Sequence, residues 1–277
     1  MLCSVGARFI VPEGVYIMLP AYAAYLIDLD GVIYRGEHLL PGARDFVVWL
    51  DTRQKKYLFL TNNSFASERQ VIEKLARLGI VTNKSHVLGA GQAAVRSIAR
   101  RFAGARVYVV GEQALIDMVQ AHHLTAVSAD SREADVLLVG LDRDFNYKKL
   151  TNAAAVVRAG ASFIAVNRDA TLPIMGDLIP GCGAMVAAIE AASGIAPEVI
   201  GKPQPALLQE AMQQLASRPD ETIMIGDGLD IDIAGGKAAH TSTLLVLSGK
   251  DSRESLMRSP FKPDFVYENL AAMLIDV

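Results

Sequence analysis

Short hydrophobic runs alternate with amphipathic helical patterns along almost the whole chain. Helical patterns such as EQALIDMVQAHH (112–123) and PALLQEAMQQL (205–215) follow these runs within a few residues. The runs that we predict to be strands include AAYLID (23–28), KYLFL (56–60), RVYVV (106–110), VLLVG (136–140), SFIAV (162–166), TIMIGD (222–227) and STLLVL (242–247). Polar residues rarely interrupt them, which is typical of strands buried on both faces of a parallel sheet. The pattern therefore predicts an α/β protein in which helices cover a parallel sheet.

Two further signals locate helices. We expect a helix around Gly42 to Thr52, and Ser67 with Gln70 three residues later is the capping-box pattern that begins another helix. The segment GAGQAA (89–94) opens a helix after the run HVL and imitates a dinucleotide-binding loop. Because the run before it is short, we favour a hinge where the chain crosses from one domain to the next.

Composition and charge narrow the class of protein. The chain has 277 residues, which is long for one layered domain and comfortable for two. Its formal net charge is −3, from 27 Lys and Arg against 30 Asp and Glu. This balance provides no basic footprint, so we expect no nucleic acid and no membrane among its partners. Cys3 and Cys182 lack metal-ligand spacing and predict no disulfide framework and no zinc site, which fits a cytoplasmic protein.

Residues 1–19 differ from the rest of the chain. They are fairly apolar, but Arg8, Pro12 and Glu13 interrupt them, so no run is long enough to span a bilayer. They also lack a convincing secretory cleavage pattern. We expect an irregular N-terminal extension, with Met18 as an alternative start of the folded part.

Chemically capable side chains follow four of the predicted strands. Ligands of open α/β sheets bind beyond the carboxyl ends of the strands. Those positions hold Asp28 with Asp30, Thr61, Lys202, and Asp227 with Asp232. Clustered carboxylates need a counter-charge to stay ionised, and oxygen ligands select a hard cation such as Mg²⁺. A hydroxyl and an ammonium suit the charged oxygens of a phosphoryl group, so the set predicts phosphoryl transfer through a divalent cation.

The four segments also match a known pattern. The motifs DLDGVIY (28–34), LTNNS (60–64), GKPQP (201–205) and GDGLDIDI (226–233), in this order, resemble those of the haloacid dehalogenase (HAD) superfamily of phosphohydrolases. The long segment between the second and third motifs is similar to subfamily IIA, which carries a large α/β cap. Within it, GVIYRG (31–36) and VNRDATLPIMGDLIPGCGAMVAAIE (166–190) resemble NagD-type and para-nitrophenyl phosphatase-like enzymes. The resemblance implies a Rossmann-like, doubly wound core at 20–84 plus 198–277, interrupted by a cap domain at 85–197.

The resemblance implies a role for each motif residue. Asp28 would be the nucleophile that forms an aspartyl phosphate, and Asp30 would be the general acid and base. Mg²⁺ would be held by Asp28, the main-chain carbonyl of Asp30 and Asp227, with Asp232 orienting a bound water nearby. Thr61 and Lys202 would be catalytic groups that contact the phosphoryl oxygens. The remaining substrate contacts would come from Asn62, Asn63, the cap-loop residues Asn167 and Asp169, and Gly228.

These residues favour Mg²⁺-dependent hydrolysis of a small phosphorylated metabolite, but rival functions remain open. A dehalogenase would share the fold and the nucleophile yet needs no cation, so Asp30 and Asp227 argue against it. A phosphomutase would share the site, although the large cap is similar to that of phosphatases. The third rival is a catalytically idle nucleotide-binding or regulatory module. Asp232 has a purely structural alternative as a helix-capping residue. The substrate stays open among nucleotide monophosphates, sugar phosphates, glycerol phosphate, phosphoglycolate and pyridoxal phosphate, and a homodimer through the cap is one assembly open to the chain.

Overall fold

The described residues form two compact units. The structure is a computed structural model that describes residues 19–62, 68–128, 131, 133–174 and 177–276. The first unit takes its described residues from Met1–Leu60, Glu68–Leu88 and Lys202–Val277, and the second takes them from Thr61–Ser67 and Gly89–Gly201. Segments from both ends of the chain thus build the first unit. That the second unit acts as a cap stays a prediction.

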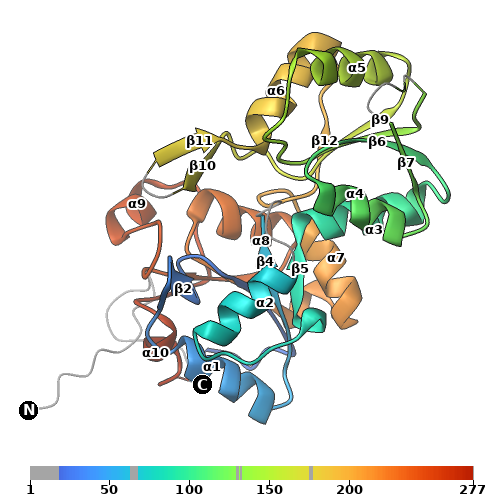
Figure 1. Cartoon of the computed structure of the whole chain (residues 1–277). Helices are drawn as coiled ribbons and strands as arrows, with labels where there is room; N and C mark the ends of the chain where they lie inside the picture. Colours follow the sequence, from blue (N-terminus) through green and yellow to red (C-terminus); the bar gives the residue numbers. More distant parts are fainter. Residues whose placement is uncertain (1–18, 63–67, 129–130, 132, 175–176, 277) are drawn as a thin grey trace, which may run out of the picture. The chain divides into compact units, whose positions relative to one another are not determined.

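A parallel sheet forms the centre of the first unit (Figure 1). Its six strands run in the order β15 (Phe265–Tyr267), β14 (Ser242–Val246), β13 (Thr222–Gly226), β1 (Ala24–Asp28), β4 (Lys56–Thr61) and β5 (Val87–Gly89). Strand β1 pairs in parallel with β13 on one side and with β4 on the other. From β1 the chain proceeds toward β4 and β5, and from β13 it proceeds the opposite way, toward β14 and β15. The order therefore reverses between β1 and β13, and such a reversal is where doubly wound sheets bind ligands.

Helices of the first unit pack against this sheet and against each other. They are α1 (Ala43–Thr52), α2 (Glu68–Arg77), α7 (Ala206–Leu215), α8 (Ala234–Ala238), α9 (Arg253–Arg258) and α10 (Leu270–Met273), with shorter helical turns at η1 (Lys84–His86), η2 (Pro219–Glu221) and η3 (Leu229–Ile233). Helix α1 shows why the pattern forms a helix: its buried residues, Ala43, Phe46, Val47 and Leu50, recur at the spacing of one helical face. The Phe46 ring meets the Tyr25 ring of β1 edge to face, with 5.9 Å between centroids.

The second unit has its own parallel sheet. Its five strands run in the order β12 (Glu198–Val199), β9 (Ser162–Ala165), β8 (Val136–Val139), β6 (Arg106–Val110) and β7 (Thr125–Val127). Helices α5 (Tyr147–Arg158) and α6 (Cys182–Ser193) cover one face, and α3 (Ala90–Arg101) and α4 (Gln113–Ala121) cover the other (Figure 1). The antiparallel hairpin of β10 (Thr171–Ile174) and β11 (Asp177–Pro180) follows β9. Both units thus confirm the predicted α/β class with parallel sheets.

Some local expectations differ from the structure. The sequence also predicts a helix from Ala234 to His240, but α8 ends at Ala238, and a wide π-type turn, η3, precedes it. The pattern also gave no sign of the antiparallel pair β2 (Tyr34–Arg35) and β3 (His38–Leu39), of β7, of β15 or of α9. The capping residue Ser67 lies outside the described residues.

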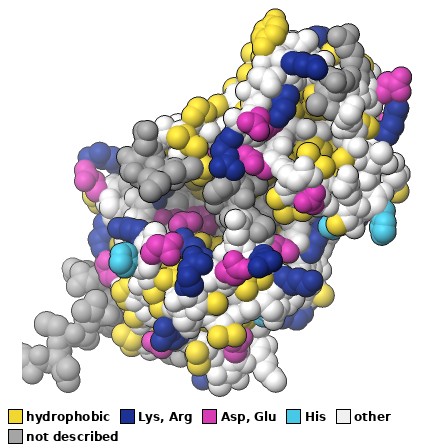
Figure 2. All heavy atoms as spheres, viewed as in Figure 1, with side chains coloured by type: hydrophobic (Ala, Val, Ile, Leu, Met, Phe, Trp, Pro, Cys, Tyr) yellow, Lys and Arg dark blue, Asp and Glu magenta, His cyan; other side chains and the backbone are white. Residues whose placement is uncertain are grey.

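On the face drawn in Figure 2, the described Lys and Arg side chains lie interspersed with Asp and Glu. Within the part of the chain that the structure describes, no helix has both the length and the apolar character needed to cross a bilayer. The expected partners stay predictions.

Candidate active site at the carboxyl ends of β1 and β13

Two neighbouring strands bring two motif aspartates to the same edge of the first sheet. Asp28 is the last residue of β1, and Asp227 directly follows β13. The strands are in register from Ala24 with Thr222 to Ile27 with Ile225, so both aspartates lie at the carboxyl edge where the strand order reverses. Asp28, Asp227 and Asp232 each present one carboxylate oxygen, and these three oxygens lie within 4.8 Å of one another. This acidic cluster is a group that could hold a metal ion.

Lys202 is the cation inside this cluster. Its Nζ donates to Asp28 Oδ1 at 2.5 Å and to Asp232 Oδ1 at 2.6 Å, and its side chain is only 1% exposed. Three ionised carboxylates and one ammonium leave a formal charge of −2, which a divalent cation would neutralise. Because carboxylate oxygens are the ligands that Mg²⁺ prefers, the residues present fit that ion.

The pKa values of the carboxylates and of Lys202 reflect the same excess of negative charge. Burial raises the pKa of Asp28 well above its usual range, Lys202 opposes the shift, and the charges of Asp232 and Asp227 add to it. Burial and Asp232 raise the pKa of Asp227 to about 6, against a smaller lowering effect of the Lys250 main-chain N–H. Burial alone would lower the pKa of Lys202, but Asp232 and Asp28 outweigh it and raise it. Lys202 alone is therefore insufficient to stabilise the ionised form of all three carboxylates.

Asp30 lies just beyond the cluster on a tight turn. The Gly31 N–H donates to the Tyr34 carbonyl at 2.8 Å, and Gly31 has φ +79°, a conformation that favours glycine. Solvent reaches Asp30, yet desolvation of its carboxyl raises its pKa, while Lys74 and Lys202 oppose the shift. The Lys74 Nζ lies 3.7 Å from the centroid of the Tyr34 ring. The raised pKa of Asp30 suits a general acid. Lys74 is a charged neighbour of Asp30 that the sequence gave no reason to single out.

Asp232 is held more firmly than the other two acids. Its Oδ2 accepts the N–H groups of Asp227 at 3.2 Å and Gly228 at 3.0 Å, and Lys202 bonds its Oδ1. The residue is 2% exposed within η3, where the N–H groups of Asp232 and Ile233 both donate to the Gly228 carbonyl. Since both oxygens already accept hydrogen bonds, Asp232 is placed to orient neighbouring groups, and its predicted supporting role stays a prediction.

Apart from Gly228, the other predicted site residues belong to the second unit. Thr61 is the buried last residue of β4, and Asn63 lies outside the described residues. The Asn167 side chain, 3% exposed, donates from Nδ2 to the Asn62 carbonyl at 2.6 Å, and its Oδ1 accepts the Asp169 N–H at 3.1 Å. The structure thus brings Asn62, Asn167 and Asp169 together. Their predicted contact with the substrate, like that of Thr61 and Gly228, stays a prediction.

Comparison with known proteins identifies the family of the chain. Residues 25–125 match the family described as haloacid dehalogenase-like hydrolase, and residues 199–273 match one described as HAD-hydrolase-like. The chain is 34% identical to 5'-nucleotidase YutF of Bacillus subtilis over 252 residues, which cover 91% of this chain and 97% of the relative. The chain belongs to the haloacid dehalogenase-like hydrolase family.

Solved structures narrow the class further. The p-nitrophenyl phosphatase from Archaeoglobus fulgidus matches with a TM-score of 0.86 and 34% identity, covering 93% of this chain and 100% of its own. NagD from E. coli K-12 matches with a TM-score of 0.84 and 31% identity, covering 91% of this chain and 98% of its own. Within the family the chain is therefore NagD-like, and its enzyme class is phosphatase.

Proposed function

We propose that this phosphatase uses Mg²⁺ to hydrolyse small phosphomonoesters through an aspartyl phosphate on Asp28. The observation that carries the proposal is the unbalanced charge of Asp28, Asp227 and Asp232 around a single lysine. When bound there, the cation would supply the charge stabilisation that phosphoryl transfer requires.

Each reacting residue has a defined task in the proposed reaction. Lys202 holds Oδ1 of Asp28, which leaves Oδ2 to attack the phosphorus atom. The bond from phosphorus to the leaving oxygen breaks as Asp30 gives that oxygen a proton. Water then attacks the phosphorus of the aspartyl phosphate and passes its proton to Asp30, and the bond to Asp28 breaks to release inorganic phosphate.

The names of the relatives and the polar loop of the second unit support a substrate class. Proteins similar to this chain are named as a 5'-nucleotidase and a p-nitrophenyl phosphatase. We infer that nucleotide monophosphates, sugar phosphates or metabolites of similar size are the substrates. Asn167 and Asp169, on the loop that leads into the β10–β11 hairpin, would select the leaving group. Substitutions there should redistribute activity among substrates while sparing the chemistry common to all of them.

Phosphate release tests the function. Metal-stripped protein is incubated with a panel of phosphorylated metabolites and p-nitrophenyl phosphate, with and without Mg²⁺, and Asp28→Asn is the control. We expect release only with Mg²⁺ and only from the unaltered enzyme. Full release in excess chelator, with metal content verified as nil, would contradict the proposal. Phosphate moved to another position on the substrate would indicate a mutase, halide released from a haloacid would indicate a dehalogenase, and no reaction at all would indicate an idle module.

A further inference from the structure

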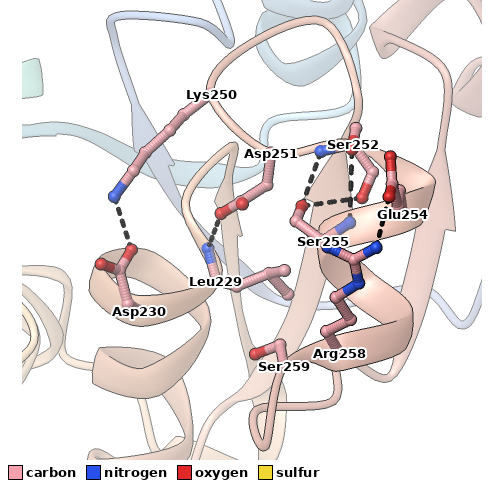
Figure 3. A pocket seen from close by; sticks show the side chains of 9 residues that line it. All are labelled: Leu229, Asp230, Lys250, Asp251, Ser252, Glu254, Ser255, Arg258 and Ser259. Atoms are coloured by element: carbon pink, nitrogen blue, oxygen red, sulfur yellow. Dashed lines mark hydrogen bonds and ion pairs between the residues drawn. The ribbon is translucent and has the colours of Figure 1, made fainter.

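A loop that follows β14 lies against the carboxylate of Asp227. The Lys250 N–H donates to Asp227 Oδ2 at 2.6 Å, and the Asp251 N–H donates to the Asp227 main-chain carbonyl at 3.1 Å. Asp251 also accepts the Leu229 N–H at 2.7 Å through Oδ2 (Figure 3). The loop therefore bonds the side chain of Asp227, its main-chain carbonyl and the main-chain N–H of Leu229. We call residues 248–251 the 248–251 loop.

Two glycines form a narrow slot around this carboxylate. A Cβ built on Gly249 would lie 1.9 Å from Asp227 Oδ2, and one on Gly31 would lie 2.0 Å from the same oxygen and 2.9 Å from Gly249 Cα. Gly249 is not among the residues with positive φ, so close approach explains a glycine here without any need for a left-handed backbone. The carboxylate thus has little freedom to rotate, and Oδ2 is the oxygen that faces the slot.

Arg35 binds the main chain of the loop. Its Nη2 donates to the carbonyls of Ser248 at 2.6 Å and Gly249 at 2.9 Å, and the Ser248 hydroxyl donates to the Gly31 carbonyl at 2.8 Å. These bonds tie the turn that follows the nucleophile strand to the loop that holds Asp227. Because Arg35 is exposed and its partners are carbonyl oxygens, its removal should leave the folded core intact.

We propose that Arg35 and the 248–251 loop are positioning elements that fix the Asp227 carboxylate for a divalent cation. The inference rests on the proposed function, since Asp227 is a proposed metal ligand. Some groups orient a metal ligand without touching the metal. They strengthen the affinity for the ion, because the ligand is already arranged when the ion binds. The Lys250 side chain is not part of the device: it points to Asp230 in the pocket of Figure 3, in an ion pair of 2.7 Å between largely exposed groups.

Calorimetric titration of metal-stripped protein with Mg²⁺ tests the proposal. We expect Arg35→Ala to bind Mg²⁺ about 10-fold more weakly, Gly249→Ala about 100-fold more weakly, and Arg35→Lys to fall between Arg35→Ala and the unaltered protein. Phosphate release by Arg35→Ala should require more Mg²⁺ but reach, at saturation, a rate within about threefold of the unaltered enzyme. The melting temperature of the metal-free Arg35→Ala protein should be nearly unchanged, which separates lost positioning from lost folding.

Matched controls come from the second unit. Arg158 also donates from its guanidinium to a main-chain carbonyl, that of Ala192 at 2.7 Å, so Arg158→Ala should bind Mg²⁺ normally. Gly91→Ala is the glycine control, because its Cβ would meet only Leu115 Cδ1 at 3.5 Å.

The outcomes separate this proposal from the proposed function. If the unaltered enzyme binds Mg²⁺ and hydrolyses substrate, but Arg35→Ala and Gly249→Ala bind within twofold of it, only the positioning role is overturned. If the unaltered protein neither binds Mg²⁺ nor depends on it, the proposed function fails and takes this inference with it. If Gly249→Ala does not fold, Arg35→Ala and Arg35→Lys decide the question alone.

Discussion

The two parallel sheets carry acids at the ends of their strands but neutralise them differently. In the second unit, Glu112 after β6 pairs with Arg143 at 2.8 Å. Asp142 after β8 pairs with Lys149 at 2.7 Å. Each of these acids has a cation of its own, whereas three carboxylates in the first unit share one lysine. The strand order reverses in both sheets, between β6 and β8 as between β1 and β13, so topology alone does not distinguish them. The charge balance does distinguish them: acids that each have their own cation support a fold, and acids that outnumber their cation call for another.

Neutralising one acid in each sheet should give opposite results. Asp28→Asn should lower turnover by at least about 10⁴-fold, because it removes the nucleophile. It should not lower the melting temperature of the metal-free protein, since one repelling charge is gone. Asp142→Asn should keep activity within a few-fold but cost roughly 1–3 kcal/mol of unfolding free energy, because Lys149 loses its partner. Steady-state kinetics and thermal melts of both variants measure this, and near-normal turnover of Asp28→Asn would remove Asp28 as the nucleophile.

A substitution of Asp30 tests whether the general acid and the nucleophile are separate residues. Asp30→Asn should slow the step that forms the aspartyl phosphate by about 10²–10⁴-fold on an alkyl phosphate, whose leaving oxygen needs a proton. The loss should be far smaller on p-nitrophenyl phosphate, because a phenolate departs unaided.

The formation step must be isolated, since Asp30 would also activate the water that clears the intermediate. A rapid-quench burst of alcohol or phenol release under single-turnover conditions does so. Equal slowing for both leaving groups would show that Asp30 is not the general acid.

The two lysines offer a test through stability. Lys202→Met leaves the buried Asp232 and the half-buried Asp28 and Asp227 without this counter-charge, so the metal-free protein should lose roughly 3–5 kcal/mol near neutral pH. Lys149→Met should cost less, because Lys149 is 27% exposed and Asp142 also accepts the Asp144 N–H. Denaturant melts give both values. If the two variants lost similar amounts of unfolding free energy, the acidic cluster of Asp28, Asp227 and Asp232 would carry no special excess of negative charge.

The smallest expected effect is the pH dependence of stabilisation by Mg²⁺. The native-state pKa of Asp227 is about 6 against an ordinary 3.8, so the native state favours its protonated form. The stability contributed by this group is complete below the ordinary pKa and declines as pH rises through about 6. Mg²⁺ should therefore raise the melting temperature by roughly 5 °C at about pH 7.5 and much less at about pH 5, where protons compete with it. An equal increase at both pH values would contradict the role of Asp227.

Hydrophobic pattern predicted the α/β fold and the strand ends at which the acidic cluster lies. Buried strands such as β1 and β13 are long enough for their apolar runs to be recognised, and the positions where these runs end identified Asp28 and Asp227. Strands β2 and β3 have two residues each, too few to show any period.

The support around Asp227 left no trace in the sequence for a different reason. The Lys250 group that reaches Asp227 is a main-chain N–H, which every residue but proline possesses. The need for a glycine at position 249 becomes evident only in the folded chain, where the loop lies against Asp227. Residue types revealed the charges, and only the folded chain revealed what holds them in place.

The central claim is that a divalent cation binds where the acids are unbalanced and not where they are paired. Anomalous scattering from a crystal grown with Mn²⁺ as a substitute for Mg²⁺ tests this most directly. The account predicts one strong peak between Asp28 and Asp227, at roughly 2.0–2.3 Å from a carboxylate oxygen of each. A map without a peak there, or with its strongest peak beside Asp142 and Glu112, would contradict it.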